Sequence, residues 1–262
     1  MSDSGNTIFA LRDVCFAYND TEILHDVRVD FTSGSFTGVI GRNGAGKTTL
    51  FRLLTGELHP QRGTVALHGR DLHAYAARER ARLIAVVPQN EDMVFPFTVR
   101  SMVLLGRGPH LGYFGYETQA DIAAAERAME LAGVAKFAAR KVTDLSGGEL
   151  HRVLIARALA QETPILLLDE PNAHLDLRHQ VELFELLSRL HMEGRTILCI
   201  THDLNLAAKY CKRLIMLDEG RTVADGSPYD VLTEEHLERH FGVRTRVTME
   251  DDAPSIRLLR GG

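Results

Sequence analysis

The sequence predicts an α/β fold with a largely parallel central sheet. Short apolar runs without polar alternation recur along the chain, and turns or helical stretches follow them. Such runs are typical of strands that are covered on both faces, as in a parallel sheet. The runs that support this prediction are residues 36–40, 83–87, 165–168, 196–200 and 214–217.

Two other regions differ from this pattern. Near the amino end, residues 8–18, 24–31 and 64–67 are expected to form antiparallel strands that flank the core. Residues 98–140 are rich in alanine and have a helical pattern, which a glycine-rich stretch at 106–115 interrupts. We therefore expect a helical subdomain inserted between strands of the α/β core.

Composition excludes several classes of function. The chain has 262 residues and a formal net charge of −5, which argues against nucleic-acid binding because a phosphate backbone attracts a basic surface. No apolar run approaches the roughly 20 residues of a membrane span, and the first seven residues lack a secretory signal. Three cysteines without metal or disulfide spacing, Cys15, Cys199 and Cys211, are expected to be reduced thiols in a cytosolic compartment.

Residues 41–48 match the phosphate-binding pattern G-x-x-x-x-G-K-[ST] between an expected strand and an expected helix at 47–55. Backbone N–H groups of such a loop, with the first turn of the helix, surround phosphate oxygens. Lys47 would reach the β- and γ-phosphates, Thr48 would bind Mg²⁺, and Thr49 would contact the α-phosphate. The predicted nucleotide-binding residues of this loop are Gly41, Arg42, Asn43, Gly44, Ala45, Gly46, Lys47, Thr48 and Thr49. The pattern occurs in kinases, GTPases and ATPases, so it leaves the reaction open.

A buried strand at 165–168 runs into two carboxylates, Asp169 and Glu170. Asp169 is placed to hold Mg²⁺ through water. Because side chains alternate along an extended backbone, Glu170 is expected to point the other way and to polarise an attacking water.

A second glycine-rich helix start lies 23 residues before Asp169. It consists of Leu145, Ser146, Gly147, Gly148 and Glu149, and a helix is predicted at about 150–160. By itself it is an ordinary helix cap. One subunit needs only one phosphate cradle, however, so the simplest explanation is that this segment contacts ATP held by another copy of the chain.

The order and spacing of these motifs, with Gln89 and His202, resemble the nucleotide-binding subunits of ATP-binding cassette (ABC) transporters over essentially the whole chain. The resemblance implies a P-loop NTPase (RecA-like) core with an antiparallel β subdomain and an inserted α-helical subdomain. It implies one domain at 6–243, divided into a nucleotide-binding core with the β subdomain, a helical and signature subdomain, and a returning core. These parts are residues 6–90, 91–155 and 156–243, and a tail follows at 244–262 for which we expect an edge hairpin.

The resemblance also implies a role for single residues. Gln89 is similar to the glutamine that completes the Mg²⁺ shell, and Asp176 to the D-loop aspartate at a dimer seam. His202 is similar to the switch histidine at the γ-phosphate, Glu170 to the catalytic base, and Tyr18 to an aromatic residue that stacks on adenine.

In the same family the signature residues contact ATP across a head-to-tail dimer, as we expect for Ser146 and Gly148. Two positions depart from the common pattern: Glu149 stands where glutamine is commoner, and Asn172 replaces a frequent threonine or serine. Neither is a phosphate contact in this interpretation, so hydrolysis is still expected.

Residues 95–99, 106–112 and 173–180 resemble the corresponding segments of importers of metal chelates, that is, iron-siderophores, haem or cobalamin. This implies ATP and Mg²⁺ as ligands, a second copy of the chain and polytopic permease subunits as partners, and a periplasmic or lipid-anchored substrate-binding protein as an indirect one. It also implies a peripheral position at the cytoplasmic face of the cell membrane.

Two alternatives belong to other classes. A soluble ABC ATPase that acts in cluster assembly, or in another non-transport role, would carry the same motifs. A small-molecule kinase would need the P-loop but neither the signature segment nor His202. The spacing of His110, His174 and His179 offers no clear set of metal ligands.

Overall fold

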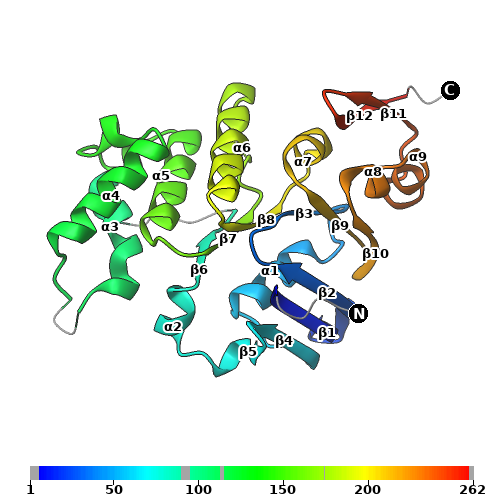
Figure 1. Cartoon of the computed structure of the whole chain (residues 1–262), viewed down its shortest axis with the longest axis horizontal. Helices are drawn as coiled ribbons and strands as arrows, with labels where there is room; N and C mark the ends of the chain where they lie inside the picture. The colour runs from blue at the N-terminus through cyan, green and yellow to red at the C-terminus, as the bar shows by residue number, and fades with distance from the viewer. Residues whose placement is uncertain (1–5, 90–94, 113–114, 174, 260–262) are drawn as a thin grey trace. The chain divides into compact units, whose positions relative to one another are not determined.

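The computed structural model of the chain describes residues 6–89, 95–112, 115–173 and 175–259 (Figure 1). The chain forms two compact units. Unit 1 consists of Met1–Tyr75 with Thr196–Gly262, and unit 2 consists of Ala76–Arg195. Among the described residues, none of the helices combines the length and apolar character that a membrane span requires.

Unit 1 contains a four-stranded antiparallel sheet of order β2-β1-β4-β5. Its strands are β1 (Thr7–Tyr18), β2 (Thr21–Thr32), β4 (Arg62–Leu67) and β5 (Arg70–Asp71). Phe9 of β1 and Phe31 of β2 are fully buried and meet edge to face with ring centroids 6.3 Å apart. The antiparallel strands expected near the amino end are therefore confirmed.

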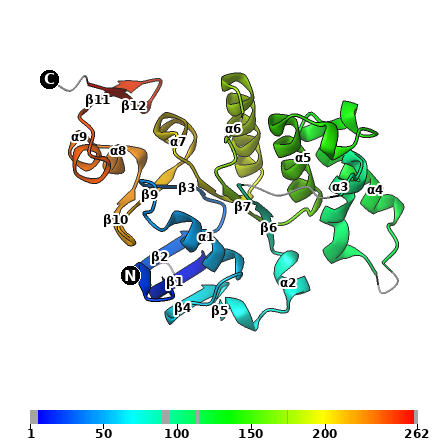
Figure 2. The same cartoon turned by 180° about the vertical axis from the view of Figure 1, so that it is seen from behind.

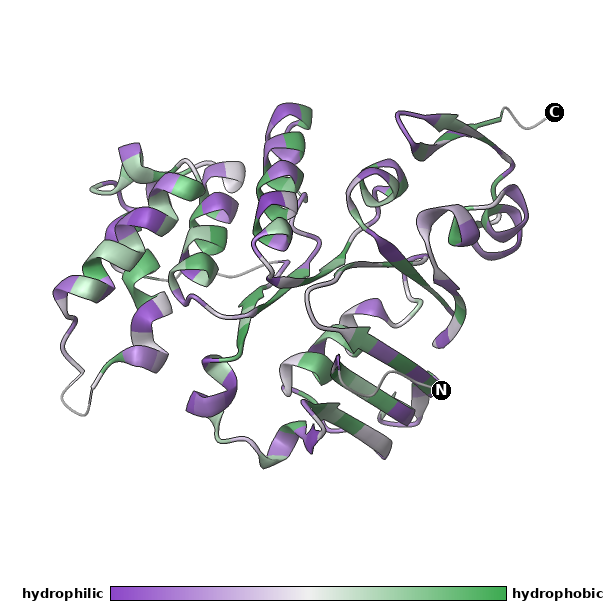
Figure 3. Ribbon diagram, viewed as in Figure 1, coloured by the Kyte–Doolittle hydropathy of each residue, from purple (hydrophilic) through white to green (hydrophobic). Residues whose placement is uncertain are grey.

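Unit 1 also contains parallel strands that carry the site. β3 (Phe36–Ile40) pairs in parallel with β8 (Thr196–Ile200) and β9 (Arg213–Asp218), and β10 (Arg221–Gly226) runs antiparallel to β9. Every residue of β3 and β8 is buried, so these runs need no polar alternation. Figure 3 shows the hydrophobic residues concentrated along them. The helices α1 (Lys47–Thr55) and α7 (Leu204–Tyr210) follow β3 and β8.

The carboxyl-terminal part of unit 1 forms α8 (Pro228–Val231), α9 (Glu234–His236), a π-helical turn (Leu237–Phe241) and a hairpin of β11 (Thr245–Glu250) and β12 (Ala253–Leu258). Figure 2 shows the hairpin beyond α8 and α9. The hairpin is a two-stranded sheet of its own, so the expected position at the edge of a larger sheet is wrong. Side chains occupy backbone groups of its strands instead: Asn205 accepts from Ile256 N at 2.8 Å, and Glu234 accepts from Val247 N at 3.1 Å.

Unit 2 contains the parallel pair β6 (Ile84–Val87) and β7 (Ile165–Asp169). Its helices are α2 (Ala77–Ala81), α3 (Val99–Leu104), α4 (Gln119–Leu131), α5 (Gly147–Ala160) and α6 (Leu177–Met192). Short 3-10 turns lie at Leu105–His110, Ala135–Phe137 and Val142–Asp144. The predicted helical insertion is thus confirmed as α3, α4 and the turns beside them.

A buried ion pair holds the helical part of unit 2 together. Arg107, 7 % exposed, donates to Asp121 Oδ1 at 2.9 Å and to Glu162 Oε2 at 2.8 Å. The backbone beside Arg107 can pack closely against Arg157 only because residue 106 is a glycine. A Cβ at Gly106 would lie 2.1 Å from the Arg157 carbonyl oxygen. Hydrogen bonds from Thr118, and then the pairing with Arg107, lower the pKa of Asp121 to about 2. The glycine-rich stretch therefore has a packing role that the sequence did not reveal.

Candidate functional site

The predicted phosphate-binding loop lies in unit 1 between β3 and α1. Gly41 and Gly46 are packed from behind: a Cβ at Gly41 would lie 2.2 Å from the Leu217 carbonyl oxygen, and one at Gly46 would lie 2.7 Å from Leu24 Cδ2. A Cβ at Gly44, by contrast, would meet no atom within 4 Å. The backbone is thus fixed on its inner side and open at its tip, where Arg42 and Asn43 are also exposed.

Lys47 is 5 % exposed, and its Nζ donates to the carbonyl oxygens of Gly41 and Arg42, each at 2.9 Å. These bonds place the ammonium group against the loop. Thr48 is exposed at the first turn of α1, whereas Thr49 is buried. Gly46, the N-cap residue of α1, has no side chain to cap the first N–H groups of the helix, and such a helix start suits an anion.

A second turn supports this loop. Gly220 N donates to Ala45 O at 3.2 Å, and His25 N donates to Gly220 O at 2.9 Å. Gly220 has φ 72°, and a Cβ there would lie 2.1 Å from Ile23 O. Sequence reasoning missed this contact, because Gly220 is far along the chain from both Ala45 and His25.

Tyr18 ends β1 and is 41 % exposed. Its ring meets Phe16 edge to face, with centroids 4.9 Å apart, and its hydroxyl accepts from Arg52 Nη1 of α1 at 3.4 Å. The exposed ring is suited to stacking on a base. Its adenine contact stays a prediction.

His202 lies between β8 and α7 and is exposed. Asp203 beside it caps α7, because its Oδ1 accepts from Leu206 N at 2.9 Å, and Thr201 Oγ1 accepts from Asp203 N at 3.1 Å. These bonds fix the backbone on the carboxyl-terminal side of His202.

The acidic pair lies in unit 2, where β7 ends at Asp169, which is 4 % exposed. The extended conformation expected at Glu170 is wrong: its φ is +50°, and Ala173 N donates to Glu170 O at 3.0 Å in the turn that follows. A left-handed backbone is costly for a residue with a Cβ, and strained conformations of this kind cluster at functional sites. Glu170 is therefore oriented by this turn and not by strand alternation. Its carboxylate accepts a hydrogen bond from Gln89 Nε2 at 2.7 Å.

Residues 145–149, here called the signature segment, open α5. Leu145 N donates to Val142 O at 3.3 Å, and Ser146 is the N-cap residue. Glu149 Oε2 accepts from Ser146 N at 2.9 Å and from Ser146 Oγ at 3.0 Å, and Ser146 Oγ accepts from Glu149 N at 3.3 Å, so the two residues form a capping box. Residues 146–149 of the segment line a pocket, here called the signature pocket, together with Asp176. Unit 2 therefore brings the predicted signature and D-loop residues to one surface.

Asp176 also caps α6, since its Oδ1 accepts from His179 N at 2.9 Å and lies 2.9 Å from His179 Nδ1. The backbone bond from His179 is the main cause that lowers the pKa of Asp176. His110 Nε2 contacts Gln161 O at 2.8 Å, and His174 lies outside the described residues. Within the described ranges, no group of three His, Cys, Asp or Glu side chains gathers as a metal site.

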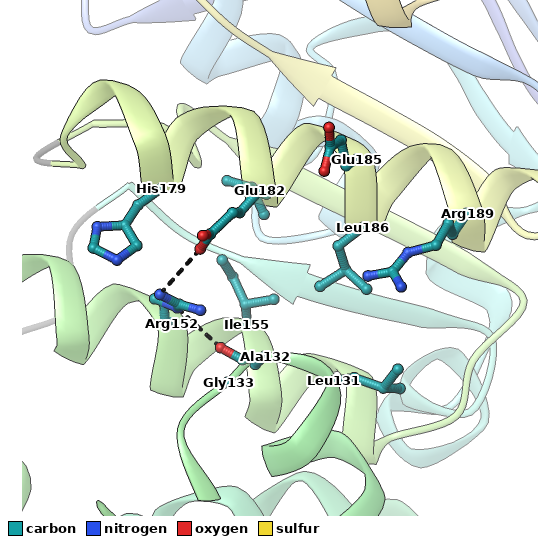
Figure 4. Close-up of a pocket in the computed structure, with 11 residues that line it drawn as sticks. Leu131, Ala132, Gly133, Arg152, Ile155, His179, Glu182, Glu185, Leu186 and Arg189 are labelled. Atoms are coloured by element: carbon teal, nitrogen blue, oxygen red, sulfur yellow. Dashed lines mark hydrogen bonds and ion pairs between the residues drawn. The ribbon is translucent and has the colours of Figure 1, made fainter. Parts of the chain in front are cut away.

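A second pocket of about 200 Å³ shares Gly133, Arg152 and His179 with the signature pocket. Figure 4 shows Arg152 between the turn after α4 and helix α6. Its Nε donates to Ala132 O at 2.9 Å, and its Nη1 lies 3.6 Å from Glu182 Oε2. Arg152, one helical turn beyond the signature segment, thus connects α5 with the turn after α4 and with α6.

A glycine loop before α1, an acidic pair after β7 and a serine-capped helix start define a P-loop ATPase cassette. The chain belongs to the ABC transporter family, whose model matches residues 24–173. The predicted P-loop NTPase fold is confirmed by this match and by the solved cassettes that it resembles.

Relatives of the chain include import proteins. It is 47 % identical over 228 residues to the cobalamin import ATP-binding protein BtuD of Halobacterium salinarum, covering 87 % of this chain but only 57 % of that protein. It is 45 % identical to the hemin import ATP-binding protein HmuV of Burkholderia pseudomallei, covering 89 % of this chain and 93 % of that protein. Ferric enterobactin transport ATP-binding protein FepC of Escherichia coli is 41 % identical, with 88 % and 85 % covered.

Solved structures give the same family. An inward-facing putative metal-chelate type ABC transporter superposes with a TM-score of 0.82 at 28 % identity, over 97 % of each chain. The dimeric cassette MJ0796 has a TM-score of 0.75 at 27 % identity, covering 84 % of this chain and 99 % of that one.

Proposed function

We propose that this chain is the ATP-hydrolysing subunit of an ABC importer for metal chelates: iron-siderophores, haem or cobalamin. One observation carries the motor part: a single chain holds both an open P-loop and a separate serine-capped helix start that shares a pocket with Asp176. One nucleotide needs only one of these, so the second serves another copy. The hemin and ferric enterobactin relatives, matched over most of their length, support the cargo class.

ATP binds at the P-loop of unit 1. Backbone N–H groups of residues 41–46 and of the α1 start surround the phosphates, Lys47 neutralises the β- and γ-phosphates, and Tyr18 stacks on adenine. Thr48, Asp169 and Gln89 supply hydroxyl, carboxylate and amide oxygens, the hard donors that Mg²⁺ prefers, so the residues present fit this ion. When bound, Mg²⁺ neutralises charge on the phosphate oxygens.

Three side chains contribute to hydrolysis. Glu170 orients a water and takes its proton as the water oxygen bonds to the γ-phosphorus and the bond to the β–γ bridging oxygen breaks. His202 donates to the γ-phosphate. Gln89, bonded to Glu170 at 2.7 Å, holds the carboxylate before this step.

Two copies associate head to tail around two nucleotides. Ser146 and Gly148 of each copy contact the γ-phosphate held by the other, and Asp176 lies at the seam. Only ATP bridges both copies, so its hydrolysis shifts the equilibrium back to the open state, as a ligand-driven switch requires. The two copies act on polytopic permease subunits from the cytoplasmic face of the membrane. A substrate-binding protein delivers the chelate to the permease.

The experiment uses Glu170→Gln, which removes the base and keeps the side-chain shape. We expect this variant to form a stable dimer with Mg-ATP, measured by analytical ultracentrifugation, while the wild type dimerises only transiently. If Glu170→Gln stays monomeric at saturating ATP, the proposed ATP-driven dimerisation is wrong. In membranes, the wild-type chain is expected to co-purify with a polytopic protein; recovery only with a soluble assembly partner contradicts the importer.

A further inference from the structure

Arg140 contacts the chain on both sides of Ser146. Its Nη2 donates to Asp144 O at 2.7 Å, two residues before Ser146, and its Nη1 lies 3.8 Å from Glu149 Oε1, three residues after it. The backbone of Arg140 is itself fixed, because its carbonyl accepts from Val99 N at the start of α3 at 2.9 Å. One side chain therefore connects the chain before the segment with the carboxylate within it.

Glu149 brings a negative charge to the serine that the proposed function assigns to a phosphate. Both Ser146 N and Ser146 Oγ donate to this carboxylate, and these bonds, helped by the positive charges of Arg140 and Lys136, hold the pKa of Glu149 below its ordinary value. The group is therefore ionised at neutral pH. A γ-phosphate that approaches Ser146 would meet like charge a few ångströms away, which opposes binding unless a cation compensates.

Arg140 and Lys136 both contribute positive charge near this carboxylate. Lys136 Nζ and Arg140 Cζ lie 4.9 and 5.1 Å from the ring centroid of Phe137, which lines the signature pocket. The other charged groups of the pocket have partners of their own: Arg152 contacts Ala132 O and Glu182, and Asp176 contacts His179, which also lines the pocket.

We propose that Arg140 is a positioning residue of the signature segment, which anchors Glu149 and, with Lys136, balances its charge so that Ser146 can receive the γ-phosphate of ATP bound to a second copy. This inference rests on the proposed function. It also explains how this chain can carry an acid at the fifth signature position. Glutamine would complete the same capping box without the charge, so the need for Arg140 should vanish with Glu149→Gln.

A double-mutant cycle tests this. In the Glu170→Gln background we compare Arg140→Ala with its parent, then repeat the comparison with Glu149→Gln in both proteins, and measure the ATP concentration at which half the chains are dimeric. We expect Arg140→Ala to raise this midpoint about tenfold when Glu149 is retained and less than about twofold when both proteins also carry Glu149→Gln. Arg140→Lys should restore part of the loss.

Arg100→Ala is the matched control, because Arg100 is equally exposed in unit 2 and pairs with Glu126; it should not move the midpoint. Equal effects of Arg140→Ala in the two backgrounds would mean a purely structural role and overturn the inference. If the Glu170→Gln parent itself stays monomeric with ATP, the proposed function fails. A parent that dimerises without coupling between Arg140 and Glu149 overturns this inference alone.

Discussion

Gln89 Nε2 donates a hydrogen bond to Glu170 Oε2 at 2.7 Å, although 81 residues separate them in the chain. Gln89 follows β6 and Glu170 follows β7, and these strands pair in parallel, so their carboxyl ends lie at one edge. The bond joins the predicted Mg²⁺-binding amide to the predicted base. The conformation of the carboxylate therefore depends on the residue that should sense the nucleotide.

This bond predicts coupled effects on hydrolysis. Glu170→Gln should lower kcat by about 10²- to 10⁴-fold, and Gln89→Leu by about tenfold. Because both act on one carboxylate, the double variant should be no slower than Glu170→Gln alone in single-turnover hydrolysis. Losses that multiply would show that the two residues act independently. Glu126→Gln, on an exposed pair far along the chain from both, serves as the control.

The turn at Gly220 should control the P-loop. Gly220→Ala introduces a Cβ 2.1 Å from Ile23 O in a left-handed backbone, so we expect a loss of about 1–3 kcal/mol in unfolding free energy and weaker ATP binding. Gly69→Ala has nearly the same φ, 75°, but meets no atom within 4 Å. Urea unfolding measures the stability of both variants, and titration with a fluorescent nucleotide measures their ATP affinity. The difference between the variants isolates the steric clash from the cost of a left-handed alanine. Equal unfolding free energies for the two variants would contradict the clash with Ile23 O, and equal ATP affinities would contradict the support of the P-loop by Gly220.

Tyr18 should contribute stacking and little through its hydroxyl. We expect Tyr18→Ala to weaken ATP binding by about 1–3 kcal/mol, a typical value for loss of an aromatic stacking partner. Tyr18→Phe removes the 3.4 Å bond from Arg52 and keeps the ring, so its affinity should stay close to that of the wild type. Isothermal titration of the two variants tests this, and equal losses would show that the hydroxyl matters.

The Arg107–Asp121 pair should stabilise unit 2. Arg107→Ala leaves a buried carboxylate without its cation, so we expect a loss of about 3–5 kcal/mol in unfolding free energy. The exposed ion pair between Arg100 and Glu126 serves as the comparison. Arg100→Ala should lower the unfolding free energy by at most about 1 kcal/mol. Chemical denaturation of the whole chain measures both. Similar losses would mean that the Arg107 pair is effectively solvated.

The hydrogen bonds from Thr118, and then the pairing with Arg107, also predict a pH dependence through Asp121. The pKa of Asp121 falls from the ordinary 3.8 to about 2 in the folded chain, so the unfolded chain binds this proton more readily. Its contribution to stability is complete above about pH 4 and is lost as the pH falls towards 2. Asp121→Asn should flatten the fall in unfolding free energy over this interval. An unchanged slope would contradict the depressed pKa.

Local sequence patterns determined much of this protein. The strand at 36–40 and the helix at 47–55 are located as predicted, because a short, mostly apolar run and a glycine turn each determine the local structure around them. The capping ability of Ser146 was equally readable, since a cap needs only residues within one turn of helix.

The tertiary structure decided what depends on distant partners. The bond between Gln89 and Glu170, the support of Ala45 by Gly220 and the contact of Arg107 with Glu162 left no pattern in neighbouring residues. Each depends on a backbone or side chain that only folding brings within hydrogen-bonding reach. Sequence spacing therefore predicted which groups carry the chemistry, and long-range packing determined how they are held.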